Sequence, residues 1–351
     1  MHAFRFRRFV VVIAVLVAAP VSSAAASAAR PAAAPNAYTV TKLVADQAGK
    51  APKSDPDLVD PWGMTSSASG PWWVSDRATS RSTIYTLDGT KNALVVSTGG
   101  QPTGVVFNPK SAEFDGNSYL YATLGGGIEG WKAADGTHTI LYVDHSVFGT
   151  VYTGLTIGTN SSGDFLFAAD FHDAEIDVFD ASFHPASVAG RFLDPSLPAG
   201  YAPFNVQNLG GFIYVTYALQ DPTGTHDVPG PGHGIVDQFD ADGILLNRIA
   251  TGGALNSPWG LAVAPTVWGK FSNDLLVGNH GNGRINAYHV KGAAWAHHGV
   301  LDLPKGTPLK IAGLRAIALG NGGNGGPVDH LFFTAGPKLG ARGLFGYVAA
   351  E

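Results

Sequence analysis

The sequence has no cysteine, few charged residues and no apolar segment long enough to span a membrane. The lack of cysteine excludes disulfide bonds, cysteine catalysis and lipid attachment through a cysteine. Charged residues make up 14% of the chain, and no basic run follows residue 8. Nucleic acid and anionic lipid are therefore not expected as partners. Gly-x-Ser-x-Gly and His-Glu-x-x-His motifs are also absent, so serine-hydrolase and zincin chemistry have no support.

Glycine and proline are abundant, with 46 and 22 copies, and short apolar runs lie between them. This composition suits many short strands joined by turns. One pattern recurs six times: a turn that enters an apolar strand, a second apolar strand ending in a small or polar residue, and a third strand that alternates. Its clearest copy comprises Ser257–Pro265, Asp274–His280 and Arg284–His289.

The spacing of this repeat predicts the architecture. The third residues of the six opening motifs are residues 63, 104, 154, 205, 260 and 316, so the steps run from 41 to 56 residues. A period of this length with several short strands per unit is typical of a β-propeller. We therefore predict an all-β, six-bladed β-propeller with four antiparallel strands in each blade. The expected outer strands are Asn92–Ser97, Thr139–Val143, Gly190–Leu193, Ile244–Ile249 and Gly299–Leu303.

The sixth copy has no fourth strand of its own, because it ends at Tyr347 and Val348. An unassigned strand, Tyr38–Val44, precedes the first copy. Pairing it into the last blade would close the ring and remove an open sheet edge. We therefore expect residues 37–351 to form one propeller.

The first 29 residues have the features of a signal peptide. Three arginines precede an eleven-residue apolar run, Phe9–Ala19, and small residues follow. Residues 30–36 are predicted to be a disordered link. These features indicate a secreted, monomeric protein without a membrane anchor. Loss of the three arginines would lower the formal net charge from −5 to −8.

The clearest repeat also carries a family resemblance. Pro258–Val263, followed by Leu275–Asn279 and Gly283–Tyr288, resembles an NHL-type repeat of six-bladed propellers. That group includes gluconolactonase-like metal lactonases, peptide-amidating lyases and recognition modules, so the resemblance implies a fold and no single activity. Asn205–Gly211 and Gly320–Gly326 complete a pattern similar to a family of exported bacterial propeller proteins.

Strand direction predicts where a site would lie. The start of each first strand and the loop between strands two and three should open on one face. Asp76, Asp170, Asn205 and Asn279 would meet there, and their oxygens suit Ca²⁺ or another divalent cation. The resemblance implies a similar acid and amide ligand set, although the first-blade glutamate of gluconolactonase-like enzymes has no counterpart. Alternatively, these residues end strands because Asp and Asn favour turns.

Histidines and aromatic residues fall on the same predicted face. His172 and His280 are the catalytic candidates, and with His226 and His233 they offer an alternative zinc site like that of the amidating lyases. His297 and His298 fall on the opposite face and are interpreted as surface residues. The candidate ligand-binding residues are Trp62, Arg77, Tyr217, His226, His233, Trp259, Asn282 and Arg315.

Two of these features have a structural alternative. Trp62 and Trp259 occupy matching positions in two blades, where they could stack on a ligand or pack between blades. The insertion Gln220–Gly234, rich in glycine and proline, could cover the channel mouth or be an inert excursion.

Two function classes follow. The first is a secreted propeller that binds an extracellular small molecule, glycan or protein at the channel mouth. The second is a divalent-metal-dependent lactonase, esterase or lyase with its site at the same place.

Overall fold

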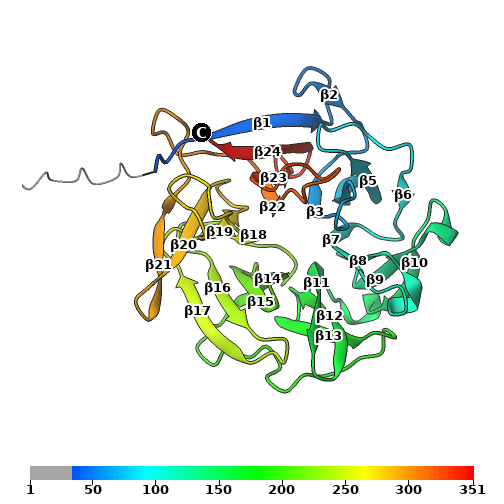
Figure 1. The fold of residues 1–351 in the computed structure, drawn as a ribbon. Coiled ribbons are helices and arrows are strands. Elements are labelled where there is room, and N and C mark those ends of the chain that lie inside the picture. The colour runs from blue at the N-terminus through cyan, green and yellow to red at the C-terminus, as the bar shows by residue number, and fades with distance from the viewer. Residues whose placement is uncertain (1–33) are drawn as a thin grey trace, which may run out of the picture. The chain divides into compact units, whose positions relative to one another are not determined.

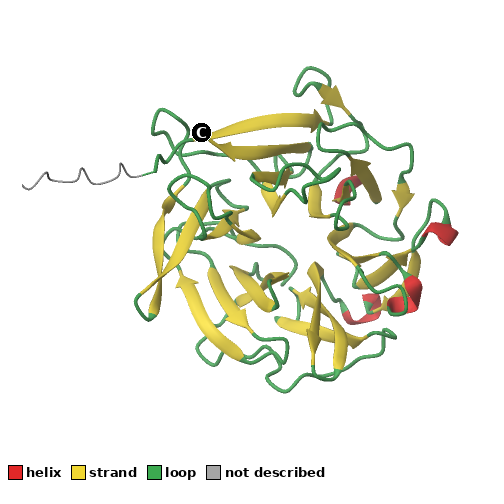
Figure 2. Cartoon of the chain, in the orientation of Figure 1, coloured by secondary structure: helices red, strands yellow, loops and turns green. Residues whose placement is uncertain are grey.

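The computed structural model describes residues 34–351, and nearly all of their regular structure is β-strand (Figure 2). The strands form six antiparallel sheets around a common centre (Figure 1). The predicted six-bladed propeller is confirmed. The predicted signal peptide, residues 1–29, and residues 30–33 of the predicted link lie outside the described residues.

The first three blades take their strands in chain order from the centre outwards. Blade one contains β3 (Pro61–Thr65), β4 (Trp72–Asp76), β5 (Arg81–Tyr85) and β6 (Val96–Ser97). Blade two contains β7 (Pro102–Phe107), β8 (Tyr119–Thr123), β9 (Gly127–Trp131) and β10 (Ile140–Asp144). Blade three contains β11 (Tyr152–Asn160), β12 (Gly163–Asp170) and β13 (Glu175–Asp180).

The remaining blades complete the ring. Blade four contains β14 (Tyr201–Leu209), β15 (Phe212–Leu219), β16 (Ile235–Phe239) and β17 (Leu245–Thr251). Blade five contains β18 (Pro258–Val263), β19 (Leu275–Asn279), β20 (Ile285–Lys291) and β21 (Ala294–Val300). Blade six contains β22 (Leu314–Leu319), β23 (His330–Ala335), β24 (Leu344–Ala350), β1 (Tyr38–Ala45) and the short β2 (Lys53–Ser54).

Helix is confined to four three-residue 3₁₀ segments in the described part: Arg77–Thr79, Phe114–Gly116, Ala133–Asp135 and Ser146–Phe148. No helix of residues 34–351 is long and apolar enough to cross a membrane.

The ring closes through the N-terminal strand, as predicted. β1 pairs antiparallel with β24, and Thr41 lies opposite Tyr347. The first and last strands lie side by side in Figure 1. Residues 34–36 of the predicted link are described, and the amide group of Asn36 donates hydrogen bonds to Val300 and Asp302 at the rim of blade five.

Blade three departs from the prediction, because Gly190–Leu193 does not form its outer strand. Arg191 and Phe192 have φ angles of 54° and 52°, which a strand does not allow. The Phe192 ring turns inwards and packs against Phe167, with ring centroids 4.8 Å apart. Burial of the Phe192 ring therefore goes with a backbone conformation in residues 190–193 that is not that of a strand.

The other blades have their outer strands at or near the predicted segments, and that of blade five is displaced towards the N-terminus. β6 is shortened to two residues, while β10 and β17 lie where they were expected. In blade five the strand begins at Ala294 instead of Gly299.

Glycine at the repeated third position allows the innermost strands to approach closely. A Cβ on Gly63 would lie 2.5 Å from the Thr103 carbonyl oxygen in the next blade. A Cβ on Gly260 would lie equally close to the Arg315 carbonyl oxygen. Asn205 occupies this position in blade four, where its amide donates a 2.8 Å hydrogen bond to the Trp259 carbonyl. The glycines of the repeat thus allow a short distance between neighbouring blades. In blade four the side chain of Asn205 instead bridges to blade five through a hydrogen bond.

Candidate functional site

First strands begin and second strands end at the same end of each blade, as the topology predicted. In blade one, Pro61 of β3 pairs with Asp76 of β4. In blade five, Pro258 of β18 pairs with Asn279 of β19. We call this end of the central channel the channel mouth.

Two indoles and a phenyl ring close the channel mouth. The ring of Trp62 lies 6.2 Å from that of Trp259 and 6.1 Å from that of Phe204, in edge-on arrangements. Both tryptophans are buried. A cavity of about 150 Å³ lies along the channel beside them, and Asn205 and Trp259 contribute to its wall. The packing role foreseen for these tryptophans is therefore present, and contact with a ligand stays a prediction.

Arg315 lies directly against this aromatic group. Its guanidinium carbon is 4.0 Å from the ring centroid of Trp62, a cation–π geometry. The side chain is only 6% exposed, and its Nε and Nη1 atoms have no hydrogen-bond partner among the described residues. Burial lowers the pKa of Arg315 to about 10, and the charges of Asp60 and Asp227 oppose this shift. The mouth therefore holds a buried cation with free donors.

Asp60 supplies one of the two nearby carboxylates. Its Oδ2 accepts hydrogen bonds from Trp62 Nε1, at 3.1 Å, and from Arg77 Nε. Its Oδ1 is buried and has no partner in the described part of the chain. The remaining Arg77 contact is a 2.8 Å hydrogen bond to Gln101. Arg77, a predicted ligand-binding residue, is thus paired with Asp60.

His280 follows β19 and lies at the mouth beside Phe204, with ring centroids 6.4 Å apart. Its Nδ1 has no hydrogen-bond partner among residues 34–351. Burial, together with the positive charge of Arg315, holds the pKa of His280 well below its usual value. These surroundings favour the neutral imidazole and leave Nδ1 as an atom available to a hydrogen-bond partner.

The blade-four loop, residues 220–234, spans the two neighbouring blades. On one side Gln220 Nε2 donates a 2.5 Å hydrogen bond to the Phe171 carbonyl of blade three. On the other side the Gly230 amide donates a 2.9 Å hydrogen bond to Asn256 Oδ1, just before blade five. Asp227 lies between these anchors, and its charge acts on Arg315. The loop thus brings a carboxylate to the mouth.

His172 lies beneath the same loop. A Cβ on Gly224 would lie 3.0 Å from His172 Nδ1, which has no hydrogen-bond partner in the described part of the structure. No hydrogen bond joins His172 to His280 within residues 34–351, and a catalytic role for either histidine stays a prediction.

The predicted metal ligands lie in separate surroundings. Asp76 accepts hydrogen bonds from the Thr83 amide and hydroxyl, at 3.1 and 2.7 Å. Asp170 Oδ1 accepts from three backbone amides, of which that of His172 is closest, at 2.9 Å.

The two amide ligands are also bonded locally. Asn279 Nδ2 donates to the Ala254 carbonyl and to Asn282, while Asn205 bridges to blade five. No hydrogen bond joins any two of the four predicted ligands in the described chain. Asp76 Oδ1 and Asn279 Oδ1 remain without partners there. The Ca²⁺ hypothesis therefore stays a prediction.

Burial raises the pKa of Asp76 well above its usual value. The Thr83 hydrogen bonds oppose this shift, and the charge of Asp55 adds to it. Asp76 Oδ1 is buried without a hydrogen-bond partner among the described residues, which further disfavours the charged form.

The remaining predicted ligand-binding residues lie away from Arg315 or in loop turns. Tyr217 is buried, and its pKa is raised well above the usual value by burial and by the charge of Asp237. His226 is exposed and contacts Thr225. His233 Nδ1 lies 2.8 Å from the Val228 carbonyl within its own loop.

Another hollow occupies the place of the missing outer strand of blade three. Its volume is about 300 Å³, and its wall includes Asp177, Arg191, Asp194 and Tyr217. Asp177 accepts a hydrogen bond from Tyr152, and Asp194 pairs with Arg248. These carboxylates are thus paired within the protein, whereas the guanidinium of Arg315 at the mouth has donors without partners among the described residues.

The alternating direction of the strands within each blade was enough to predict one shared face for five residues: Trp62, Trp259, Arg315, His172 and His280. Asp60 did not enter the predicted site because it precedes the repeat motif. Its pairing with Arg77, 17 residues further along the chain, is a tertiary feature.

Comparison with known proteins identifies relatives in a giant virus. The chain is 31% identical over 335 residues to "Uncharacterized protein R648" of Acanthamoeba polyphaga mimivirus, covering 90% of this chain and 80% of that protein. It is 32% identical over 302 residues to "Uncharacterized protein L690" of the same virus, covering 80% and 78%. The chain belongs to the family of these mimivirus proteins. No family model matches.

These viral relatives give no support to the expected membership of an exported bacterial family. Their names state no activity, so the family relationship supplies no function for this chain.

Solved structures share the fold at low sequence identity. Virginiamycin B lyase from Staphylococcus aureus superposes with a TM-score of 0.52 at 11% identity, covering 90% of this chain and all of the lyase. A glucose dehydrogenase gives 0.53 at 13%, covering 89% of this chain and 100% of the dehydrogenase. A gluconolactonase from Xanthomonas campestris gives 0.46 at 17%, covering 92% and 89%. The structural neighbours thus include enzymes, and at these identities the likeness concerns the fold alone.

Proposed function

We propose that the protein binds a small acidic ligand, such as a hydroxy-carboxylate or an acidic sugar, at the channel mouth. The observation that carries this proposal is the buried guanidinium of Arg315, whose Nε and Nη1 lack partners among the described residues. Burying an ion without hydrogen bonds is costly, so such a group gains most from a ligand that completes them. A carboxylate matches a guanidinium in both geometry and charge.

The neighbouring groups suit the rest of such a ligand. Asp60 Oδ1 and Asp227 Oδ2 are free acceptors for ligand hydroxyl groups. His280 Nδ1 is a further free site on a neutral ring. A ligand with one anionic end and several hydroxyls would therefore satisfy all four side chains.

The blade-four loop would control access. Gln220 holds it to blade three, and hydrogen bonds of Gly230, Gly232 and His233 hold it to the segment before blade five. Since Asp227 lies between these anchors, the proposed ligand enters when this part of the loop lifts. Loops on a rigid propeller ring are the usual place for such binding elements.

The proposal includes export of a monomer. The basic and apolar leader in residues 1–29 is the reason for placing the ligand outside the cell. Membership of a family of exported bacterial propeller proteins, which the viral relatives do not support, is part of the same proposal.

A second candidate is an enzyme at the same site. It is favoured by the neutral, partnerless Nδ1 of His280 in the company of a buried cation. His280 would act as a general base, and Arg315 would stabilise negative charge that develops on an ester or lactone oxygen. A divalent cation on Asp76 and Asp170 would supply Lewis-acid polarisation if it were bound.

The test uses gluconate as the acidic probe and glucose as its neutral counterpart. We expect gluconate, and not glucose, to raise the melting temperature of the purified protein. Arg315→Met should abolish this rise, because it removes the anion contact while keeping an apolar side chain of similar length. Hydrolysis of δ-gluconolactone, compared between the parent and His280→Gln, tests the enzyme candidate.

Arg284→Met is the matched control, because Arg284 is an exposed arginine in the neighbouring loop. It should keep the full gluconate response. The proposal fails if gluconate and related hydroxy-carboxylates leave the parent unchanged, or if Arg315→Met responds as the parent does.

A further inference from the structure

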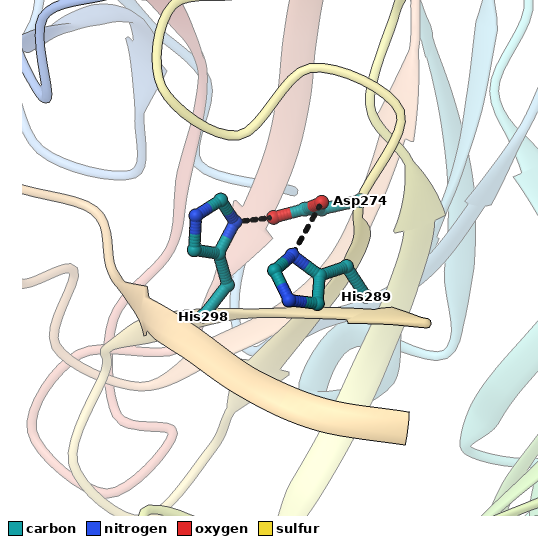
Figure 3. Close-up of side chains that lie close together, drawn as sticks. All are labelled: Asp274, His289 and His298. Carbon is teal, nitrogen blue, oxygen red and sulfur yellow. Dashed lines mark hydrogen bonds and ion pairs between the residues drawn. The ribbon is translucent and has the colours of Figure 1, made fainter. Parts of the chain in front are cut away.

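Three side chains of blade five gather at a point far from the channel mouth (Figure 3). His298 Nδ1 lies 2.6 Å from Asp274 Oδ2, and His289 Nδ1 lies 3.8 Å from Asp274 Oδ1. One ligand atom from each residue falls within 4.8 Å of the other two. Both imidazole rings point at the same carboxylate in Figure 3. The group is therefore a two-histidine, one-carboxylate cluster.

The cluster lies at the end of the blade opposite the mouth. β19 runs from Leu275 to Asn279, and Asn279 is at the mouth. Asp274 immediately precedes this strand, so it lies at the far end. The cluster and the Arg315 site are thus separate.

Strand register brings the histidines together. His289 of β20 pairs with Ala296 of β21, and Ala287 pairs with Gly299. A bulge between these pairs leaves His298 as the extra residue of β21. Side chains two residues apart in a strand share a face, so His298 lies on the same face as Ala296 and therefore as its partner His289.

The two imidazole rings are the groups that can offset the buried negative charge of the Asp274 carboxylate. Asp274 is 4% exposed, and within residues 34–351 its ion-pair partners are His289 and His298 alone. Both histidine side chains remain about one-third exposed, at 33% and 30%. Solvent can therefore reach the ring side of the cluster while the carboxylate is held in place.

We propose that Asp274, His289 and His298 bind a first-row divalent transition-metal ion. Imidazole nitrogens with one carboxylate are a ligand set suited to Zn²⁺, Ni²⁺, Cu²⁺ or Fe²⁺, and poorly suited to Ca²⁺. An ion with metal bonds of about 2.0–2.2 Å would open the 2.6 Å contact between His298 and Asp274 slightly and shorten the 3.8 Å separation of His289 from Asp274. The exposed side leaves room for water to complete the coordination.

Zinc is the probe, and the protein is the full chain without a histidine tag. Isothermal titration calorimetry should show one Zn²⁺ bound per chain with a dissociation constant in the micromolar range or tighter. His289→Ala should weaken this affinity by about tenfold or more, since loss of a ligand should exceed the loss of an outer-shell partner. His289 is the sharper variant because the shorter His298–Asp274 contact remains intact.

His330→Ala is the matched control, because His330 lies 2.9 Å from Asp329 in a pair that lacks a second histidine. It should leave the Zn²⁺ affinity unchanged. Electron paramagnetic resonance with Cu²⁺ should show coupling to two nitrogens in the parent and to one in His289→Ala. Equal Zn²⁺ affinity in the parent and His289→Ala, or no binding by the parent, would overturn the proposal.

Discussion

The indole N–H of Trp259, in blade five, donates a 3.1 Å hydrogen bond to the backbone carbonyl of Thr153, in blade three. The carbonyl of Trp259 in turn accepts a hydrogen bond from Asn205 of blade four. One residue therefore ties three blades together at the channel mouth. A ligand at the mouth would meet Arg315 and the blade-four loop outside this aromatic closure.

The short distance between the innermost strands predicts that one added methyl group at a repeat glycine lowers the stability of the fold. A Cβ on Gly104 would lie 2.5 Å from Leu155 N and 2.8 Å from the Gly154 carbonyl carbon, and neither backbone atom can move alone. Gly104→Ala should therefore lower the free energy of unfolding by about 1–3 kcal/mol, measured by chemical denaturation. Gly125→Ala is the control, because no atom lies within 4 Å of its added Cβ. Equal stability of the two variants would contradict this explanation of the repeat.

The buried carboxyl of Asp76 predicts a pH-dependent gain in stability for Asp76→Asn. Because burial raises its folded-state pKa above 3.8, the folded state favours the protonated form. The corresponding stability is present at low pH and is lost as pH rises towards the folded-state pKa. Asparagine lacks this loss, so the advantage of the variant should grow from pH 4 to pH 8 in thermal unfolding.

The same variant distinguishes a turn residue from a calcium ligand. In the absence of a metal site, Ca²⁺ and chelator should shift the parent and Asp76→Asn equally. If Asp76 binds Ca²⁺, the parent should be stabilised by Ca²⁺ and the variant should lose most of that response.

The anchoring of the blade-four loop predicts a local change for Asn256→Ala. The Gly230 amide would lose its 2.9 Å hydrogen bond to Asn256 Oδ1. Since such a bond contributes about 1 kcal/mol, hydrogen exchange of this part of the loop should accelerate on the order of fivefold. Asn282→Ala, which affects contacts of Asn279 and Arg284 only, should leave the loop unchanged. Uniform acceleration across the chain would indicate global destabilisation instead.

The N-terminal segment predicts a processed product. Expression in a secreting host should release protein whose first residue lies between Ser23 and Pro31, as read by N-terminal sequencing. Retention of an intact leader on membrane-bound material would contradict the proposed export.

The number of blades and the closure of the ring could be predicted because both follow from local patterns. Short apolar strands at a regular period can bury their faces only against neighbouring copies, and Tyr38–Val44 was a strand without a sheet. The outer strand of blade three could not be predicted in this way. Its residues have strand-like composition, but the burial of Phe192 against Phe167 decides their backbone.

The candidate sites also combine features that the sequence pattern predicts with features that only tertiary contacts decide. The repeat and strand direction were enough to place Arg315, Trp62 and His280 at one end of the channel, because equivalent positions of a propeller converge. The pairing of Asp60 with Arg77 depends on a contact between segments 17 residues apart in the chain. Likewise, His298 was interpreted as a surface residue, because its contact with Asp274 joins segments 24 residues apart in the chain. The sequence determined the periodic hydrophobic pattern and hence the fold, whereas tertiary packing alone decided which buried charges meet, because charge pairing depends on distances that periodicity does not encode.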